Sequence, residues 1–168
     1  MGAEITGNFT EILIENQERL LRYAMRFVRD SHEAQDIVQE AFRKYLEYIT
    51  AHGPESIRVP RHWLYTAVRN LAIDGLRKQQ REQNALKNKE EAAPPCKKDF
   101  QDLDMKDTLS RLYKMLSDRE REVISLKLEH DMTYAEISEV TGHKPGYVGY
   151  LVHTGIRKLR EQAMEYLQ

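Results

Sequence analysis

The chain has 168 residues, enough for one domain or two small ones, and its 26 basic and 27 acidic residues leave a formal net charge of −1. No global basic field therefore marks a nucleic-acid binder, so any DNA contact has to come from local clusters or be helped by a partner. A lone cysteine (Cys96), no apolar run near ~18 residues and no signal-peptide pattern together favour a cytoplasmic protein without disulfides or membrane spans.

Helical periodicity dominates the first half of the chain, and few segments favour strand. A first helix is expected over about 10–28. Asp30, with Glu33 three residues on, opens a second helix that ends at Gly53 and Pro54, and a third follows Pro60 over about 61–81. The apolar stripe predicted for the second helix consists of Ala34, Ile37, Val38, Ala41, Phe42, Tyr45, Leu46 and Ile49.

The character of the chain changes after the third helix. Residues 82–100 are polar and charged, contain Pro94 and Pro95, and have Leu86 as their only large aliphatic residue, which predicts a flexible linker. A further helical stretch is expected over 103–116. The sequence therefore predicts an all-α protein of two small helical lobes, 1–81 and 101–168, joined by the linker 82–100.

The second lobe contains two helix-start signatures, at Ser117 with Glu120 and at Thr133 with Glu136. In each, the hydroxyl accepts from a backbone N–H three residues on, and the glutamate accepts from the N–H of the capping residue. The second of these helices ends at Gly142, and a third begins near Pro145. This layout predicts a helix-turn-helix that reads DNA; the alternative is a small helical bundle with well-made caps.

A polar stripe faces away from the apolar stripe of the second helix. Its members are Asp36, Gln39, Glu40, Arg43 and Glu47. One interpretation is a solvated helix face, and the other is an acidic docking surface for a basic partner helix. Spacing alone leaves both open.

The third helix has a face that suits nucleic acid. Arginine neutralises phosphate, asparagine reads base edges and an aromatic ring stacks on an unpaired base. The alternative is that Trp63 belongs to the core and the arginines keep the surface soluble. The loop before the helix, which contains Arg58, is a candidate pocket for one extruded base. The face comprises His62, Trp63, Thr66, Arg69, Asn70, Arg77 and Arg81.

No pattern indicates an enzyme, a cofactor or a metal site. The six histidines form no close ligand pair, and Cys96 lies in the linker. A glycine-rich phosphate loop and a nucleophile elbow are both missing from the sequence. We therefore expect a binding protein without cofactors.

The order of these motifs resembles the extracytoplasmic-function (ECF) sigma factors of the sigma-70 family, bacterial transcription initiation factors that retain only regions two and four. The matching segments are 33–42 (EAQDIVQEAF), 63–77 with its WLY and RNLAID motifs, and 116–137 with LSDREREV and YAEI. The resemblance covers nearly the whole chain outside the first few residues and the linker. Three motifs in the right order make it specific.

The resemblance implies core RNA polymerase and promoter DNA as partners, with an anti-sigma factor as a further candidate. By this resemblance, the residues that contact the coiled coil of the largest (beta-prime) subunit are Asp36, Gln39, Glu40 and Arg43. The residues expected to recognise the minus-10 element are Arg58, Arg61, His62, Trp63, Arg69 and Asn70. Arg77 and Lys78 are expected to contact phosphates. The second lobe is expected on the beta flap, reading the minus-35 element through Tyr134, Lys144, Tyr147, Gly149, Tyr150, His153 and Arg157.

One helix departs from the family pattern. Recognition helices of this family carry several Lys, Ser and Arg residues in their first turns, whereas residues 146–154 contain no Lys or Arg. This predicts weak or atypical minus-35 reading, either through Tyr147, Tyr150 and His153 or with a recruiting protein. A third reading buries Tyr150 and Leu151 against a helix or a partner.

Two other functions remain as alternatives. One is a LuxR-like helix-turn-helix regulator, whose output lobe begins with a similar Ser-Asp-Arg-Glu motif, here at Ser117. The other is a sigma-like adaptor that binds proteins and does not recognise promoters on its own.

Overall fold

The computed structural model of the chain describes residues 2–28, 30–87 and 115–166, and every regular element within these ranges is a helix. The predicted all-α class is confirmed. The chain divides into two compact units, unit 1 (Met1–Cys96) and unit 2 (Lys97–Gln168). None of the helices in the described ranges combines the length and the apolarity needed to cross a membrane.

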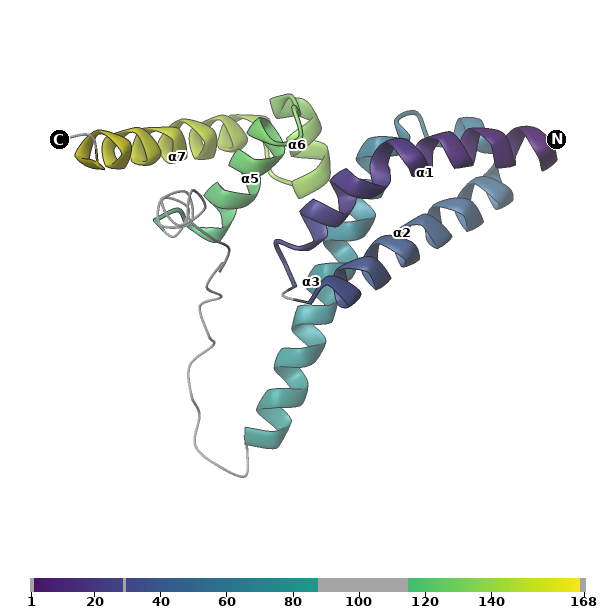
Figure 1. Cartoon of the computed structure of the whole chain (residues 1–168), viewed down its shortest axis with the longest axis horizontal. Coiled ribbons are helices and arrows are strands. Elements are labelled where there is room, and N and C mark those ends of the chain that lie inside the picture. The colour runs from purple at the N-terminus through teal and green to yellow at the C-terminus, as the bar shows by residue number, and fades with distance from the viewer. Residues whose placement is uncertain (1, 29, 88–114, 167–168) are drawn as a thin grey trace. The chain divides into compact units, whose positions relative to one another are not determined.

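Unit 1 is built from three long helices, α1 (Gly2–Ala24), α2 (Ser31–His52) and α3 (Pro60–Lys87), each of which packs against the other two (Figure 1). A short 3-10 helix, η1 (Pro54–Ser56), leads into α3. The centre of the unit is a layer of aliphatic and tyrosine side chains whose burial holds the helices together. These side chains include Leu20, Tyr23, Ala41, Tyr45, Leu64, Tyr65 and Val68.

Local chemistry sets the ends of α2. The Asp30 side chain accepts a hydrogen bond from the His32 N–H at the start, as a capping residue should. Gly53 ends the helix at φ 89°, a conformation that favours glycine, and its N–H donates to the Ile49 carbonyl. The predicted apolar stripe is buried except at two positions: Ile37 is partly exposed, and Leu46, at 37% exposed, faces solvent.

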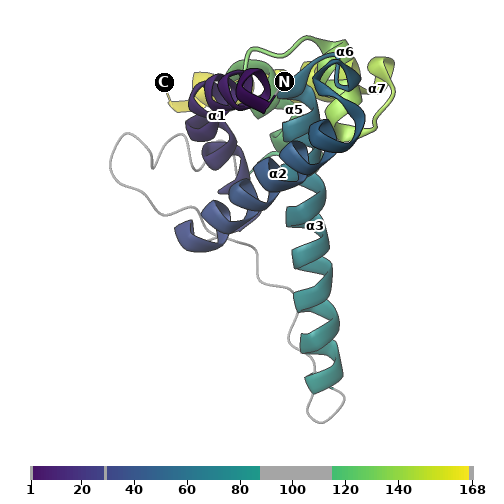
Figure 2. The ribbon, with the colours of Figure 1, turned by 90° about the vertical axis from the view of Figure 1, so that its right-hand side faces the viewer.

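Helix α3 continues past its predicted end. It runs to Lys87, so the first six residues of the predicted linker, 82–87, are helical. Their sequence, EQNALK, consists mostly of strong helix formers, and this propensity outweighs the lack of an apolar face. Figure 2 shows the end of α3 projecting beyond α1 and α2. The rest of the predicted linker, and the predicted helix 103–116 up to residue 114, lie outside the described residues.

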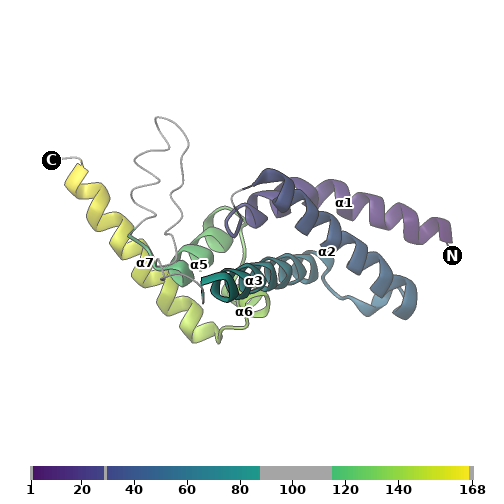
Figure 3. The same cartoon turned by 90° about the horizontal axis from the view of Figure 1, so that it is seen from below.

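Unit 2 contains α5 (Asp118–Leu128), α6 (Tyr134–Thr141) and α7 (Pro145–Tyr166), with α7 running well past α6 (Figure 3). Both predicted capping boxes are present, at Ser117 and at Thr133. Gly142 ends α6 in the left-handed conformation at φ 73°. These elements confirm the predicted helix-turn-helix layout.

Helices α5 and α7 cross closely because Gly155 has no side chain. A Cβ added at Gly155 would lie 2.2 Å from Ile124 Cδ1. At the same crossing, Lys158 donates to both carboxylate oxygens of Glu120, at 2.9 and 2.8 Å, and Glu120 is 4% exposed. Glu120 is also the glutamate of the first capping box and accepts from the Ser117 N–H at 2.8 Å.

The same contacts keep Glu120 ionised. Burial acts to raise the pKa of its carboxyl, but the hydrogen bonds from Lys158 and Ser117 together outweigh burial and leave the pKa below its ordinary value. One carboxylate therefore caps α5 and pins it to α7.

Candidate nucleic-acid interface

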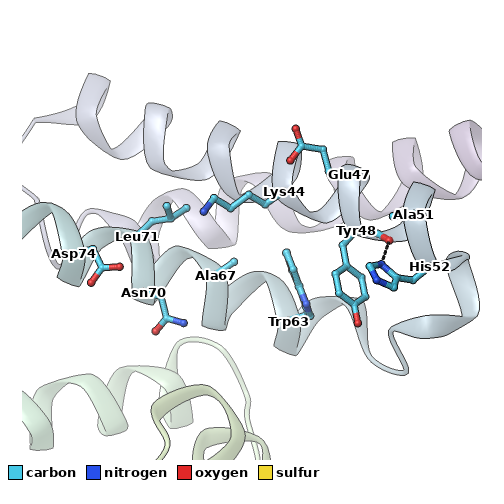
Figure 4. A pocket seen from close by; sticks show the side chains of 10 residues that line it. All are labelled: Lys44, Glu47, Tyr48, Ala51, His52, Trp63, Ala67, Asn70, Leu71 and Asp74. Carbon is cyan, nitrogen blue, oxygen red and sulfur yellow. Dashed lines mark hydrogen bonds between the residues drawn. The ribbon is translucent and has the colours of Figure 1, made fainter.

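A surface groove of about 500 Å³ lies in unit 1 between the second half of α2 and the first half of α3 (Figure 4). Because α2 and α3 pack side by side, side chains far apart in sequence meet along it. Its lining residues are Lys44, Glu47, Tyr48, Ala51, His52, Trp63, Ala67, Asn70, Leu71 and Asp74.

Aromatic side chains form one wall of this groove. The half-buried Trp63 indole lies 6.0 Å from the Tyr48 ring, and its other neighbour is the buried Tyr45 ring at 5.6 Å. The Tyr48 ring in turn stacks on His52 at 4.3 Å, while the His52 Nδ1 lies 3.0 Å from the Tyr48 carbonyl oxygen. These contacts hold the indole and the Tyr48 ring, tilted by 43° to each other, at the groove (Figure 4). Trp63 is therefore both a packing residue and an accessible one.

Polar groups stand beside the aromatic wall. Asn70 is exposed and comes two turns after Trp63 on α3, so both line the groove. Lys44 and Glu47 reach it from α2, and Asp74 from α3. The sequence placed Trp63 and Asn70 on one face, but the α2 residues were missed because contacts between helices leave no periodic signal in the sequence.

The other residues predicted for minus-10 recognition lie outside the groove lining. Arg58, Arg77 and Lys78 are exposed, and Arg77 lies 3.5 Å from the Asp74 carboxylate. His62 and Arg69 are half-buried. The Arg61 guanidinium lies over the ring of Tyr65, 5.9 Å from its centroid.

That ring belongs to the core of unit 1. Tyr65 is fully buried, and burial raises the pKa of its hydroxyl. The Arg61 guanidinium thus lies on the side of α3 that faces the core of unit 1.

The predicted polar stripe on α2 forms an acidic ridge, defined here as Asp36, Gln39, Glu40, Arg43 and Glu47. Arg43 donates to both oxygens of Glu40, at 2.7 and 2.6 Å, and also to Glu47. Hydrogen bonding to Arg43 lowers the pKa of the Glu40 carboxyl. The guanidinium is held by two carboxylates of its own helix, so three carboxylates against one cation leave the ridge net acidic.

In unit 2 most of the residues predicted for minus-35 recognition lie near the starts of α6 and α7, and Arg157 lies past the middle of α7. Tyr134 is 42% exposed, Tyr147 38% and Tyr150 61%. Gly149 is half-buried under Tyr134, while Lys144, His153 and Arg157 are exposed. Leu151 is buried. Within the described residues of unit 2, Leu151 is therefore buried and Tyr150 is not.

The arrangement offers binding surfaces. Among the side chains that the structure describes, no three His, Cys, Asp or Glu residues lie close enough together to hold a metal ion. Aromatic rings beside an amide, an acidic ridge and exposed tyrosines on a helix-turn-helix are features of macromolecular recognition.

Comparison with known proteins covers both units. Residues 13–82 match the family model of sigma-70 region 2, and residues 114–161 match that of sigma-70 region 4. The region 2 match removes the LuxR-like alternative, because the first half of such a regulator would normally be a receiver or ligand domain.

Individual relatives give the same result. The sigma factor SigV of Bacillus subtilis is 28% identical over 152 residues, covering 89% of this chain and 87% of that protein. SigL of Mycobacterium tuberculosis, an ECF sigma factor, is 28% identical over 151 residues, covering 87% and 83%.

A solved structure shares the fold. The sigma factor RpoE of Bartonella quintana, crystallised with the anti-sigma factor NepR, superposes with a TM-score of 0.68 at 23% identity, covering 92% of this chain and 95% of that one. With region 2 in unit 1 and region 4 in unit 2, the chain belongs to the sigma-70 family as an ECF-type sigma factor, which directs RNA polymerase to promoters.

Proposed function

We propose that this sigma factor, a dissociable cytoplasmic subunit without catalytic activity of its own, divides its work among three surfaces. The acidic ridge of α2 binds the beta-prime coiled coil of core polymerase. The α2–α3 groove holds an unstacked base of the minus-10 element. The starts of α6 and α7 approach the minus-35 element.

The observation that carries the proposal is the convergence of Trp63, Tyr48 and Asn70 in one groove. Stacking a base on an aromatic ring contributes about 1–3 kcal/mol, which offsets the few kcal/mol needed to unstack it from the duplex. Asn70 supplies an amide for hydrogen bonds to the base edge. Exposed Arg58, Arg77 and Lys78 stand outside the groove, where they can contact phosphates.

The acidic ridge supports docking to a basic helix. Its charge comes from Asp36, Glu40 and Glu47, and the pairs that Arg43 forms with Glu40 and Glu47 leave the Arg43 side chain preordered. Asp36 and Gln39 are exposed on the same helix face and complete the surface. Complementary charge of this kind accelerates association and sets orientation.

Of the three proposed contacts, the one with the minus-35 element should have the lowest affinity. Residues 146–154 of α7 offer no cation, and each missing phosphate contact lowers affinity and flattens its salt dependence. We therefore propose that a protein partner, either an anti-sigma factor or a recruiting factor, regulates promoter use. The Bartonella quintana relative, which binds NepR, supports the first type of partner.

Base capture is tested by permanganate reactivity of melted thymines in open complexes formed with core polymerase. The template is a promoter identified by run-off transcription. Trp63→Ala and Asn70→Ala should each reduce reactivity at least about tenfold at equal core binding, if stacking and the amide contribute about 1.4 kcal/mol or more. Asn70 is exposed, so its variant should keep unit 1 folded.

Glu55→Ala is the matched control, since Glu55 is exposed near α3 but does not line the groove. It should melt DNA like the wild type. Normal melting by both groove variants would refute base capture in this groove.

A further inference from the structure

Three exposed tyrosines occupy the part of unit 2 where a helix-turn-helix meets DNA. We name Tyr134, Tyr147 and Tyr150 the tyrosine patch. The rings of Tyr147 and Tyr150 are stacked, 6.1 Å apart and 14° from parallel. Tyr134, from the first turn of α6, lies over α7 at Gly149, where an added Cβ would be 3.6 Å from its Cε2. The Tyr134 ring therefore lies at ordinary contact distance from the position of that Cβ.

The patch is preordered by its neighbours. Tyr147 meets His143 edge to face at 5.3 Å, and the Arg119 guanidinium lies 3.5 Å from its hydroxyl. The Lys127 ammonium lies 5.6 Å from the centre of the Tyr134 ring. Rings held in this way lose little conformational entropy when a ligand binds.

The charge around the patch favours a polyanion. Residues 145–160 of α7 contain no Asp or Glu, while Lys144 precedes them and Arg157 and Arg160 stand in the later turns. Lys158 is bound to Glu120 and does not add to this charge, and Arg157 lies 3.9 Å from Glu161. Arg119 and Lys127 reach the patch from α5 through the contacts above. Duplex DNA has phosphates on both sides of its major groove. A patch of rings flanked by cations therefore matches DNA better than it matches a protein surface without acidic groups.

The residue types determine which bases can be read. Guanine is read by Arg or Lys and adenine by Asn or Gln, both through paired hydrogen bonds, whereas thymine offers a methyl group to apolar side chains. Residues 146–154 contain no Arg, Lys, Asn or Gln. We infer that the tyrosine patch recognises the 5-methyl groups of thymines in the major groove of the upstream promoter element, an inference that rests on the minus-35 role proposed above.

The test removes the methyl group alone. Deoxyuridine pairs like thymidine but lacks the methyl, so it is placed at each thymine of the upstream element of a mapped promoter, on either strand. Holoenzyme made from core polymerase and the full chain should bind each contacted site about fourfold more weakly, since burying one carbon group contributes ~0.8 kcal/mol. Deoxyuridine in the spacer should have no effect.

Variants then link the methyl effect to the patch. In Tyr147→Ser combined with Tyr150→Ser, binding should be weaker and no longer respond to deoxyuridine. Met164→Ser is the matched control, because Met164 lies on the same helix, is 60% exposed and stands about four turns beyond Tyr150. It should keep the full methyl effect.

Two results overturn the inference while leaving the sigma function intact. The first is specific initiation that is indifferent to every methyl in the upstream element. The second is a methyl effect that persists in the double tyrosine variant. Absence of any specific initiation by wild-type holoenzyme would instead count against the proposed function itself.

Discussion

The Glu120–Lys158 pair gives the sharpest stability prediction, because the chain contains a built-in control. Glu120 and Glu136 are the glutamates of two similar capping boxes, but Glu120 is buried and bound to Lys158, whereas Glu136 is only half-buried. Substituting glutamine preserves the shape of a capping box and removes only the charge. Glu120→Gln and Glu136→Gln therefore isolate what the buried charge contributes.

The expected magnitudes differ. A hydrogen bond to a charged group contributes about 1.5–3 kcal/mol and a neutral one about 0.5–1.5 kcal/mol. Lys158, at 38% side-chain exposure, can turn to water when its partner is neutral, so the penalty for leaving it unpaired is small. Glu120→Gln should lower the free energy of unfolding of unit 2 by about 1–2 kcal/mol. Glu136→Gln should change it by no more than about 0.5 kcal/mol.

The single tryptophan provides the assay. Trp63 lies in unit 1, so its fluorescence follows that unit, while circular dichroism follows both. Glu120→Gln should lower the midpoint temperature of the unit 2 transition seen by circular dichroism by about 4–8 °C per kcal/mol of lost stability. The midpoint temperature of the fluorescence transition should not change. Lys158→Met completes a double-mutant cycle. Equal effects of the two glutamine variants, or no coupling in the cycle, would refute the role of the pair.

The same carboxyl makes stability depend on pH. Because the folded-state pKa of Glu120 lies below its ordinary value of 4.5, ionised Glu120 stabilises unit 2 above that pH. The contribution disappears as the pH falls from 4.5 through the lowered pKa. Glu120→Gln should show less acid sensitivity than the wild type over this interval in acid titrations followed by dichroism, and equal sensitivity would contradict the assignment.

Three further substitutions test other parts of the account. Gly149→Ala should raise the melting temperature, by the equivalent of up to about 1 kcal/mol, whereas Gly155→Ala should lower it because its Cβ would meet Ile124 at 2.2 Å; the opposite order would contradict the packing. Asp36→Lys should weaken core polymerase binding at least about tenfold at low salt and less at high salt, and unchanged affinity would exclude the ridge. Lys144→Ala should reduce the salt slope of promoter binding by about 1, and an unchanged slope would remove Lys144 from the phosphate contacts.

Features set by neighbours in sequence were predictable. The two capping boxes span three residues each, so the starts of α5 and α6 followed from Ser117 and Thr133 alone. Gly53 and Gly142 marked helix ends because their backbone conformations favour glycine. The end of α3 was predicted too early, since the absence of an apolar face was given more weight than the helix propensity of 82–87.

Features set by packing between helices were not predictable in the same way. Tyr48 and His52 join Trp63 in the groove only because α2 and α3 lie side by side. The ring of Tyr134 covers Gly149, and the Glu120–Lys158 bond crosses from α5 to α7. Periodicity assigns each of these residues to a face of its own helix but does not say which faces meet.

The central claim is that this chain directs core polymerase to promoters, and run-off transcription of fragmented genomic DNA with mapping of RNA 5′ ends tests it most directly. Core polymerase with the chain should produce discrete new start sites that share upstream elements, and core alone should not. The element near minus-35 should be rich in A·T pairs. Failure of the chain to bind core, or stable binding without any new start site, would contradict the account.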